Sequence, residues 1–272
     1  MAARTRVALL LRAHFHLLLF DSCAFRSRST IAAYSQSQWM PLALRVASCT
    51  LLLRFASAMS TTPRATLPSL CVFDLDACLW DKEMFEMPAI PTTEDVVRGN
   101  LNGRGEGVVS VMSGRHKISL HAGSLLALQE HADGTYPGMR VALASSANTP
   151  FAEKIGRASL ALLEVVPGVT VWDVLMRDWD GVDVNQIGRQ PPLSPNKSAT
   201  HFPRLREATS VGFDKMLFFD DCNWGDHCGQ VAAACREANG RGVVTMRTPR
   251  GLGVDEFRRG MQAFADAQGQ VA

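Results

Sequence analysis

Two aspartates separated by one residue directly follow a short apolar run. Residues 70–73 have the composition of a buried strand, and Asp74 and Asp76 come at its end. A buried carboxylate without a counter-charge is strongly disfavoured, so a cation is expected beside this pair. Mg²⁺ suits the pair, because it takes carboxylate oxygens as ligands and keeps several waters. One aspartate could then attack a phosphoryl group while the other transfers protons. Alternatively, the Asp-x-Asp pattern marks only the end of a strand and its turn.

Three further places carry groups that suit the same chemistry. Each lies at the end of a predicted strand or at the start of a predicted helix: Ser145, Lys197, and the pair Asp220 and Asp221. In a parallel α/β sheet the carboxyl ends of the strands meet at one edge. Phosphoryl transfer mostly needs positioning and neutralisation of charge, which a metal ion, an ammonium group and a hydroxyl group supply together. The sequence therefore predicts that these groups gather around one divalent ion.

Strand-like and helix-like segments alternate along the chain. Apolar runs predict strands at 70–73, 139–144, 169–175, 215–219 and 243–246. Helical patterns fall at 122–131, 151–163, 197–208, 230–238 and 255–267. Two short β-leaning runs around a Gly-containing loop, 108–112 and 117–120, predict a hairpin. Alternating strands and helices imply β-α-β units, so we expect an α/β fold with a central parallel five-stranded sheet between two layers of helices.

The chain begins with a stretch of unusual composition. Residues 1–66 are rich in Arg and Ser, and Asp21 is their one acid. This composition is typical of an organelle transit peptide, so we predict a targeting or disordered extension (mitochondrion or plastid) ahead of a folded domain at 67–272. Alternatively, translation starts at Met59 and the protein is cytoplasmic. The apolar stretches of the extension are short and interrupted by arginines, so no integral membrane segment is expected.

Composition also limits the partners. The chain has 272 residues and a formal net charge of +2, but acidic residues outnumber basic ones from Asp74 onward. A mildly acidic domain is not typical of proteins that bind nucleic acid, so we expect no such partner. The seven cysteines are irregularly spaced, which indicates free thiols in a reducing compartment. We expect a monomer that acts on a small phosphorylated substrate.

The order of these groups resembles the haloacid dehalogenase (HAD) superfamily: Asp-x-Asp after one strand, Ser after a second, Lys on a later helix and Asp-Asp after another strand. More narrowly, three stretches are similar to the magnesium-dependent phosphatase-1 family: VFDLDACLW at 72–80, KSATHF at 197–202 and MLFFDD at 216–221. The resemblance covers roughly residues 69–268. It implies a HAD-like Rossmannoid three-layer sandwich with Mg²⁺ as cofactor and a small β-hairpin cap insert at 81–121.

The resemblance implies a catalytic role for three residues. Asp74 would be the nucleophile and a ligand of Mg²⁺. Asp76 would act as general acid and then as general base, and its main-chain carbonyl would bind the metal. Lys197 would hold the substrate phosphate and the charge of the nucleophile.

The remaining site residues would hold the phosphate and the metal. Ser145 and Ser146 would bind the phosphoryl oxygens, although Ser146 stands where the family commonly has Arg, which puts substrate preference in doubt. Asp220 and Asp221 would complete the metal site, with Asp221 as the direct ligand. Cys78 stands where Thr is usual and donates a weaker hydrogen bond, so the turn after Asp76 is expected to be looser.

The resemblance implies a Mg²⁺-dependent phosphoric monoester hydrolase that works through an aspartyl-phosphate. A phosphotyrosine-like group, as for a protein tyrosine phosphatase activity, and a phosphosugar are both expected substrates. One alternative is a catalytically weak HAD-like protein that binds phosphorylated partners. Another is a haloacid dehalogenase-type hydrolase, against which Asp76 argues, because dehalogenation needs no acid for its leaving group.

Overall fold

The computed structural model describes residues 66–269. Nearly all of the extension predicted over residues 1–66 therefore lies outside the described residues, and so does the alternative start at Met59. Within the described part, no helix is both long enough and apolar enough to span a bilayer.

The fold is organised around a parallel sheet. Its five strands are β1 (Leu70–Phe73), β5 (Arg140–Ser145), β8 (Gln186–Ile187), β9 (Met216–Asp220) and β10 (Val244–Arg247). They are arranged in the order β10-β9-β1-β5-β8, and every neighbouring pair is parallel. The expected α/β fold with a central parallel five-stranded sheet is confirmed. All four residues of β1 are buried, because this strand lies in the middle of the sheet.

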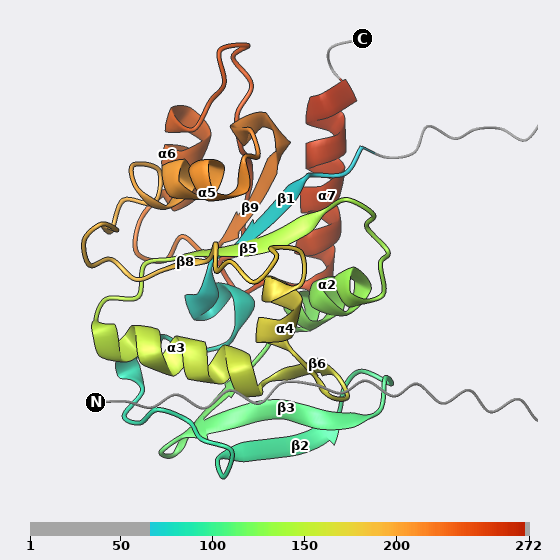
Figure 1. Ribbon diagram of the computed structural model, residues 1–272, viewed down its shortest axis with the longest axis vertical. Coiled ribbons are helices and arrows are strands. Elements are labelled where there is room, and N and C mark those ends of the chain that lie inside the picture. Colours follow the sequence, from blue (N-terminus) through green and yellow to red (C-terminus); the bar gives the residue numbers. More distant parts are fainter. Residues whose placement is uncertain (1–65, 270–272) are drawn as a thin grey trace, which may run out of the picture. The chain divides into compact units, whose positions relative to one another are not determined.

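Helices cover both faces of this sheet (Figure 1). They are α2 (Ala122–Ala132), α3 (Pro150–Leu162), α4 (Val171–Met176), α5 (His201–Thr209), α6 (His227–Ala234) and α7 (Val254–Gly269). Side chains alternate across a strand, so Cys71 and Phe73 enter one core while Leu70 and Val72 enter the other. The first core is completed by α2, α3, α4 and α7, and the second by α5 and α6. The result is a three-layer sandwich.

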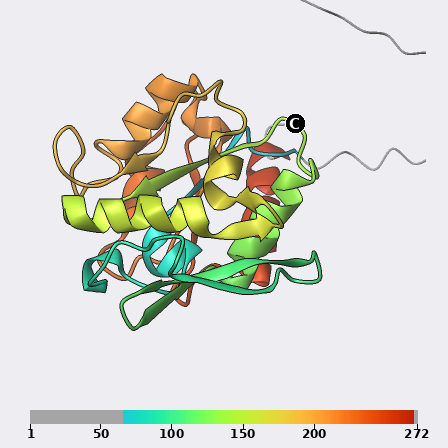
Figure 2. The same ribbon diagram turned by 60° about the horizontal axis from the view of Figure 1, so that its bottom comes forward.

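A second, antiparallel sheet is formed by the segment between the first strand and α2 (Figure 2). Its strands are β2 (Val96–Asn100), β3 (Glu106–Ser113) and β4 (His116–Ser119), in that order. The predicted hairpin corresponds to β3 and β4, whereas β2 lies outside the strands predicted from the sequence. Val108, Val111 and Ile118 belong to the first core, so this sheet is packed onto the domain.

The strand predicted at 169–175 is wrong. Only Val169–Thr170 is extended, as β7, which pairs with β6 (Glu164–Val166) outside the central sheet. The chain then turns into α4, because the hydroxyl of Thr170 accepts from the amide of Asp173 while the Asp173 carboxylate accepts from Thr170. The fifth strand of the sheet is instead β8, which lies outside every strand and helix predicted from the sequence.

The helix predicted from Lys197 begins later, at His201. Lys197 therefore precedes α5 and lies in a turn. Pro203 does not break this helix, because it lies in the first turn, where an amide has no partner within the helix.

Candidate active site

Three carboxylates meet at the carboxyl ends of the two central strands β1 and β9. Asp74 follows β1, Asp220 ends β9 and Asp221 follows it; one oxygen from each lies within 4.8 Å of the others. The register of the sheet makes this meeting unavoidable, because Phe73 pairs with Phe219 and the amide of Asp74 donates to the carbonyl of Phe219 at 2.9 Å. All three aspartates are buried. The prediction that these acids gather at one sheet edge is confirmed.

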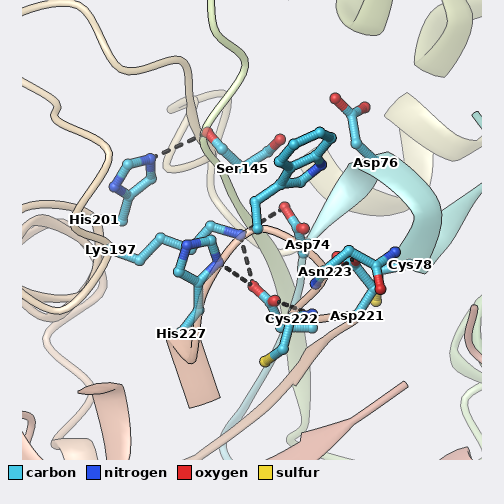
Figure 3. A network of polar contacts seen from close by, with 12 residues as sticks. Asp74, Asp76, Cys78, Ser145, Lys197, His201, Asp221, Cys222, Asn223 and His227 are labelled. Atoms are coloured by element: carbon cyan, nitrogen blue, oxygen red, sulfur yellow. Dashed lines mark hydrogen bonds and ion pairs between the residues drawn. The ribbon is translucent and has the colours of Figure 1, made fainter. Parts of the chain in front are cut away.

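A buried lysine joins two of these carboxylates (Figure 3). The Lys197 ammonium lies 2.7 Å from Oδ1 of Asp74 and 2.7 Å from Oδ2 of Asp220, and only 1% of the residue is exposed. Burial by itself lowers the pKa of Lys197, but the two carboxylates raise it above its ordinary value. Lys197 is therefore charged at any pH at which the protein would work.

The two adjacent aspartates differ in what their oxygens contact. Oδ2 of Asp220 contacts Lys197 and lies 3.3 Å from Nδ1 of His227, while Oδ1 accepts from the amide of Cys222 at 2.8 Å. Burial would raise the pKa of Asp220, yet the charge of Lys197 holds it below its ordinary range. Asp221 accepts one main-chain bond, from Asn223 at 2.9 Å. Asp221 also lines the cavity, so a ligand there can reach its carboxylate.

Several opposing effects act on the pKa of Asp74. Burial raises its pKa well above the ordinary value; Lys197 opposes this, and the nearby charges of Asp220 and Asp221 add to it. The pKa of Asp221 is raised for the same first reason, burial. Three carboxylates facing one ammonium leave a surplus of negative charge in a buried place. Hard carboxylate oxygens are the ligands of Mg²⁺ and Ca²⁺, so the residues present fit a divalent cation.

Asp76 lies in the turn Leu75–Leu79 that follows β1. Its carboxylate accepts from the indole of Trp80 at 3.1 Å and from the amide of Met84 at 3.1 Å, so it points away from Asp74 (Figure 3). Burial raises the pKa of Asp76 to about 7, against the effect of these two bonds. A carboxyl group that titrates near neutral pH can both donate and accept a proton. Trp80 is fully buried, and its indole positions Asp76.

Ser145 ends β5 and is held in place by a buried histidine. The carbonyl of Ser145 accepts from the amide of Gly188 at 2.8 Å and lies 3.1 Å from Nε2 of His201. The same ring nitrogen lies 3.0 Å from the carbonyl of Gly188, and Nδ1 lies 3.1 Å from the hydroxyl of Thr200. Burial lowers the pKa of His201 to about 4, so the ring is neutral and Nε2–H donates to both carbonyls. His201 therefore links two walls of the site.

A cavity of about 450 Å³ opens over the cluster. Six of the seven predicted site residues line it: Asp74, Asp76, Ser145, Ser146, Lys197 and Asp221. Asp220 lies behind them, fully buried against Lys197.

Several lining residues were not predicted. Glu83 and Phe85 come from the segment between β1 and β2, and Arg189 from the loop after β8. Trp224 donates from its indole to Glu83 at 3.0 Å, and its ring meets that of Phe85 edge-on at 6.0 Å. Of these, only Trp224 has a signal in the sequence, its place just after the Asp-Asp pair. The others stand in loops without a pattern.

Cys78 closes the turn that carries Asp76. Its thiol accepts from the hydroxyl of Thr248 at 3.3 Å, and its carbonyl accepts from the amide of Leu252 at 3.0 Å. Cys78 is fully buried. The turn is therefore tied to the segment after β10, and the looseness expected from Cys78 is opposed by these contacts.

Comparison with known proteins identifies the family of this chain. A model of the acid phosphatase family matches residues 66–267. Among solved structures, the chain is similar to the N-terminal part of a Bacteroides fragilis protein containing a phosphatase domain complexed with Mg, at 15% identity and a TM-score of 0.37, over 82% of this chain and 45% of that chain. It is also similar to CbbY from Rhodobacter sphaeroides in complex with phosphate, at 13% identity and a TM-score of 0.35, over 67% of this chain and 87% of that chain. The match thus spans less than half of the Bacteroides fragilis chain. Because the family model matches almost the whole described domain, this chain belongs to the acid phosphatase family, a family of haloacid dehalogenase-like phosphatases.

Proposed function

We propose that the protein is a Mg²⁺-dependent phosphatase that hydrolyses phosphomonoesters through an aspartyl-phosphate. Family membership makes phosphate esters the substrate class. The observation that carries the finer proposal is the placement of Asp74: its carboxylate lies 2.7 Å from a buried ammonium, among two further carboxylates, at the floor of the cavity.

The metal would be held by Asp74 and Asp221, with the main-chain carbonyl of Asp76 and with Asp220 beside them. Bound Mg²⁺ would neutralise charge on the phosphoryl group and on the carboxylates. Lys197 and the hydroxyl group of Ser145 would bind the remaining phosphoryl oxygens, whereas the hydroxyl group of Ser146 would face the leaving group.

Asp74 would attack the phosphorus, so that a bond forms from its carboxylate oxygen as the ester bond to the leaving oxygen breaks. Asp76 would give its proton to that leaving oxygen. In the second step, Asp76 would take a proton from water as the water oxygen attacks the phosphorus, releasing phosphate and restoring Asp74. A pKa of Asp76 near 7 supports both proton transfers, the donation to the leaving oxygen and the abstraction from water. To reach the substrate, the Asp76 side chain would leave Trp80 and Met84.

Within the family, the motifs around Asp74, Lys197 and Asp220 support a magnesium-dependent phosphatase-1 type. The expected substrate of this type is a phosphotyrosine-like group or a phosphosugar. The cavity has a surface that suits each of them. Phe85 and Trp224 offer an aromatic edge, and Ser146 offers a polar one.

The competing functions predict different results. A catalytically weak protein that binds phosphorylated partners would bind phosphate esters without releasing phosphate. A dehalogenase-type hydrolase would release halide from haloacids, and it would not need Asp76. The acid phosphatase family match favours the phosphatase over both.

Hydrolysis of p-nitrophenyl phosphate tests the proposal. Native protein, Asp74→Asn and the control Asp255→Asn, an exposed residue in the first turn of α7, are assayed with Mg²⁺ and with chelator. We expect Mg²⁺-dependent turnover in the native protein and the control, and none in Asp74→Asn. Equal rates in Asp74→Asn and the native protein would show that the nucleophile is another group.

A further inference from the structure

One cation in the cavity has no counter-charge in the described structure. Arg189 lines the cavity and is half-buried. Among residues 66–269, no carboxylate lies within ion-pairing distance of its guanidinium, and no hydrogen bond holds it. Lys197, by contrast, is already engaged by Asp74 and Asp220. Arg189 is therefore available to an anion that enters from solvent.

The position of Arg189 is fixed by its neighbours in the chain. Ile187 of β8 pairs with Ser145, and the amide of Gly188 donates to the carbonyl of Ser145 at 2.8 Å. The His201 ring then joins the carbonyls of Gly188 and Ser145. These bonds hold the main chain at Ser145 and Gly188 in place. The next residue, Arg189, therefore begins at a fixed position in the wall of the cavity.

Two polar atoms beside this loop also lack partners. The hydroxyl oxygen of Ser146 and Oδ1 of Asn148 are buried, and neither has a hydrogen bond. Both residues line the same cavity as Arg189. The side chain of Gln190 reaches the carbonyl of Asn148 at 3.4 Å, so the two loops are neighbours. Buried polar atoms without partners are costly, and a ligand that bonds them would remove this cost.

We propose that Arg189, with Ser146 and Asn148, forms a subsite for a second anionic group on the substrate, a carboxylate or a phosphate carried by the leaving group. This inference rests on the proposed phosphatase function and names its substrate class. A guanidinium binds either anion through paired hydrogen bonds, and the Ser146 hydroxyl adds a donor. Asn148 would accept from a hydroxyl group of the same substrate.

The sheet order indicates why this anion is not the phosphoryl group that is transferred. Asp74 follows β1, whereas Arg189 follows β8, two strands away across β5. Neighbouring strands are about 4.8 Å apart, so the two main-chain positions are separated by roughly 10 Å in the direction of the sheet. The transferred group must lie against Asp74, which leaves Arg189 at the side of the cavity that a leaving group would fill.

Matched substrate pairs test the subsite. Glycerol phosphate is compared with phosphoglycerate, in which a carboxylate replaces the terminal hydroxymethyl group. Propanediol monophosphate is compared with propanediol bisphosphate, which separates the phosphate source from the carboxylate source. The ratio of kcat/KM within each pair is measured for native protein, Arg189→Met, Arg189→Lys and the charge-matched control Arg98→Met, an exposed residue of β2.

We expect the native protein to prefer the anionic member of at least one pair. Arg189→Met should lower that preference about 10-fold or more, as expected when a hydrogen bond to a charged group is lost. Arg189→Lys should keep part of it, and Arg98→Met should keep it all. If the preference is absent from the native protein or survives in Arg189→Met, the subsite is refuted. If both members of a pair lose rate equally, Arg189 contacts the transferred phosphoryl group instead.

The phosphatase proposal is tested separately by Mg²⁺-dependent hydrolysis of p-nitrophenyl phosphate in the native protein. If that hydrolysis is absent, calorimetric affinities for glycerol phosphate and phosphoglycerate replace the rates. A preference for phosphoglycerate that disappears in Arg189→Met would then support the subsite, and equal affinities in the native protein would overturn it.

Discussion

Replacing Lys197 by Met removes the ammonium group that lies 2.7 Å from both Asp74 and Asp220. Methionine fills similar space, so the change acts mainly through charge. The two carboxylates are nearly inaccessible to water and would lose their shared counter-charge. Removing one partner of a buried ion pair typically costs about 3–5 kcal/mol, because the other charge stays buried and uncompensated. With the slope expected for urea unfolding, this is a shift of about 2 M in the unfolding midpoint.

The loss should depend on pH with a definite sign. Without Lys197, burial and mutual repulsion hold the folded-state pKa of both carboxyl groups above the unfolded value of about 4. A group with a raised folded-state pKa binds its proton more tightly in the folded state, so the destabilisation shrinks as the pH falls. It should be largest at neutral and alkaline pH and clearly smaller near pH 5.

Urea unfolding in the presence of chelator measures this, at pH 8 and at pH 5. The control is Lys215→Met, because Lys215 is exposed and lies 3.9 Å from Asp214, an arrangement worth less than about 1 kcal/mol. Equal midpoints for Lys197→Met and Lys215→Met at pH 8 would refute the reasoning. So would a Lys197→Met deficit that grows as the pH is lowered.

Three further outcomes follow from the site. Asp76→Asn should lower kcat/KM for alkyl phosphates about 100-fold or more. In the native protein kcat/KM should decline above pH 7, because the acid form of Asp76 is lost there, and this decline should be missing from the pH profile of Asp76→Asn. Asp221→Asn should raise the Mg²⁺ concentration that gives half-maximal activity at least about 10-fold, measured by titration against Asp226→Asn as a control. His201→Leu should raise KM, because Ser145 and Gly188 lose their common donor. The difference in stability between the native protein and His201→Leu should shift against the native protein as the pH drops from about 6.5 toward 4, since the buried ring resists protonation, and thermal unfolding of both proteins over this range measures it.

The sheet and the acid cluster were predictable because their signals are local. The runs at β1 and β9 are short and wholly apolar, and aspartates follow both directly. Once the sheet is parallel, strand ends must lie at one edge, so the meeting of Asp74 with Asp221 follows from topology. Lys197 is placed in the site as a residue at the start of a predicted helix and by its resemblance to a family motif, whereas the structure has it in a turn before α5.

Most of the remainder depends on tertiary contacts that no local pattern carries. β8 is two residues long, and its place beside β5 comes from the bonds of Gly188 and His201 to Ser145. The error at 169–175 arose because Val169 to Val171 suits a strand, whereas the mutual bonds of Thr170 and Asp173 begin a helix. The spacing of Thr170 and Asp173 is that of a capping pair, which can be recognised from the sequence alone. Arg189 lies in a loop with no pattern of its own, and the fold alone shows that it faces the cavity.

Trapping the covalent intermediate tests the central claim most directly. Asp76→Asn is mixed with p-nitrophenyl phosphate and Mg²⁺. The p-nitrophenolate leaving group departs with little need for a general acid, so the first step still proceeds. The attack of water in the second step has lost its general base, so the intermediate should accumulate. The mixture is quenched with acid and its peptides are analysed by mass spectrometry. We predict one added phosphoryl group on the peptide that contains Asp74, and none on that peptide in the double variant Asp74→Asn/Asp76→Asn. A phosphoryl group on any other residue, or the same adduct in the double variant, would contradict the assignment of Asp74 as nucleophile.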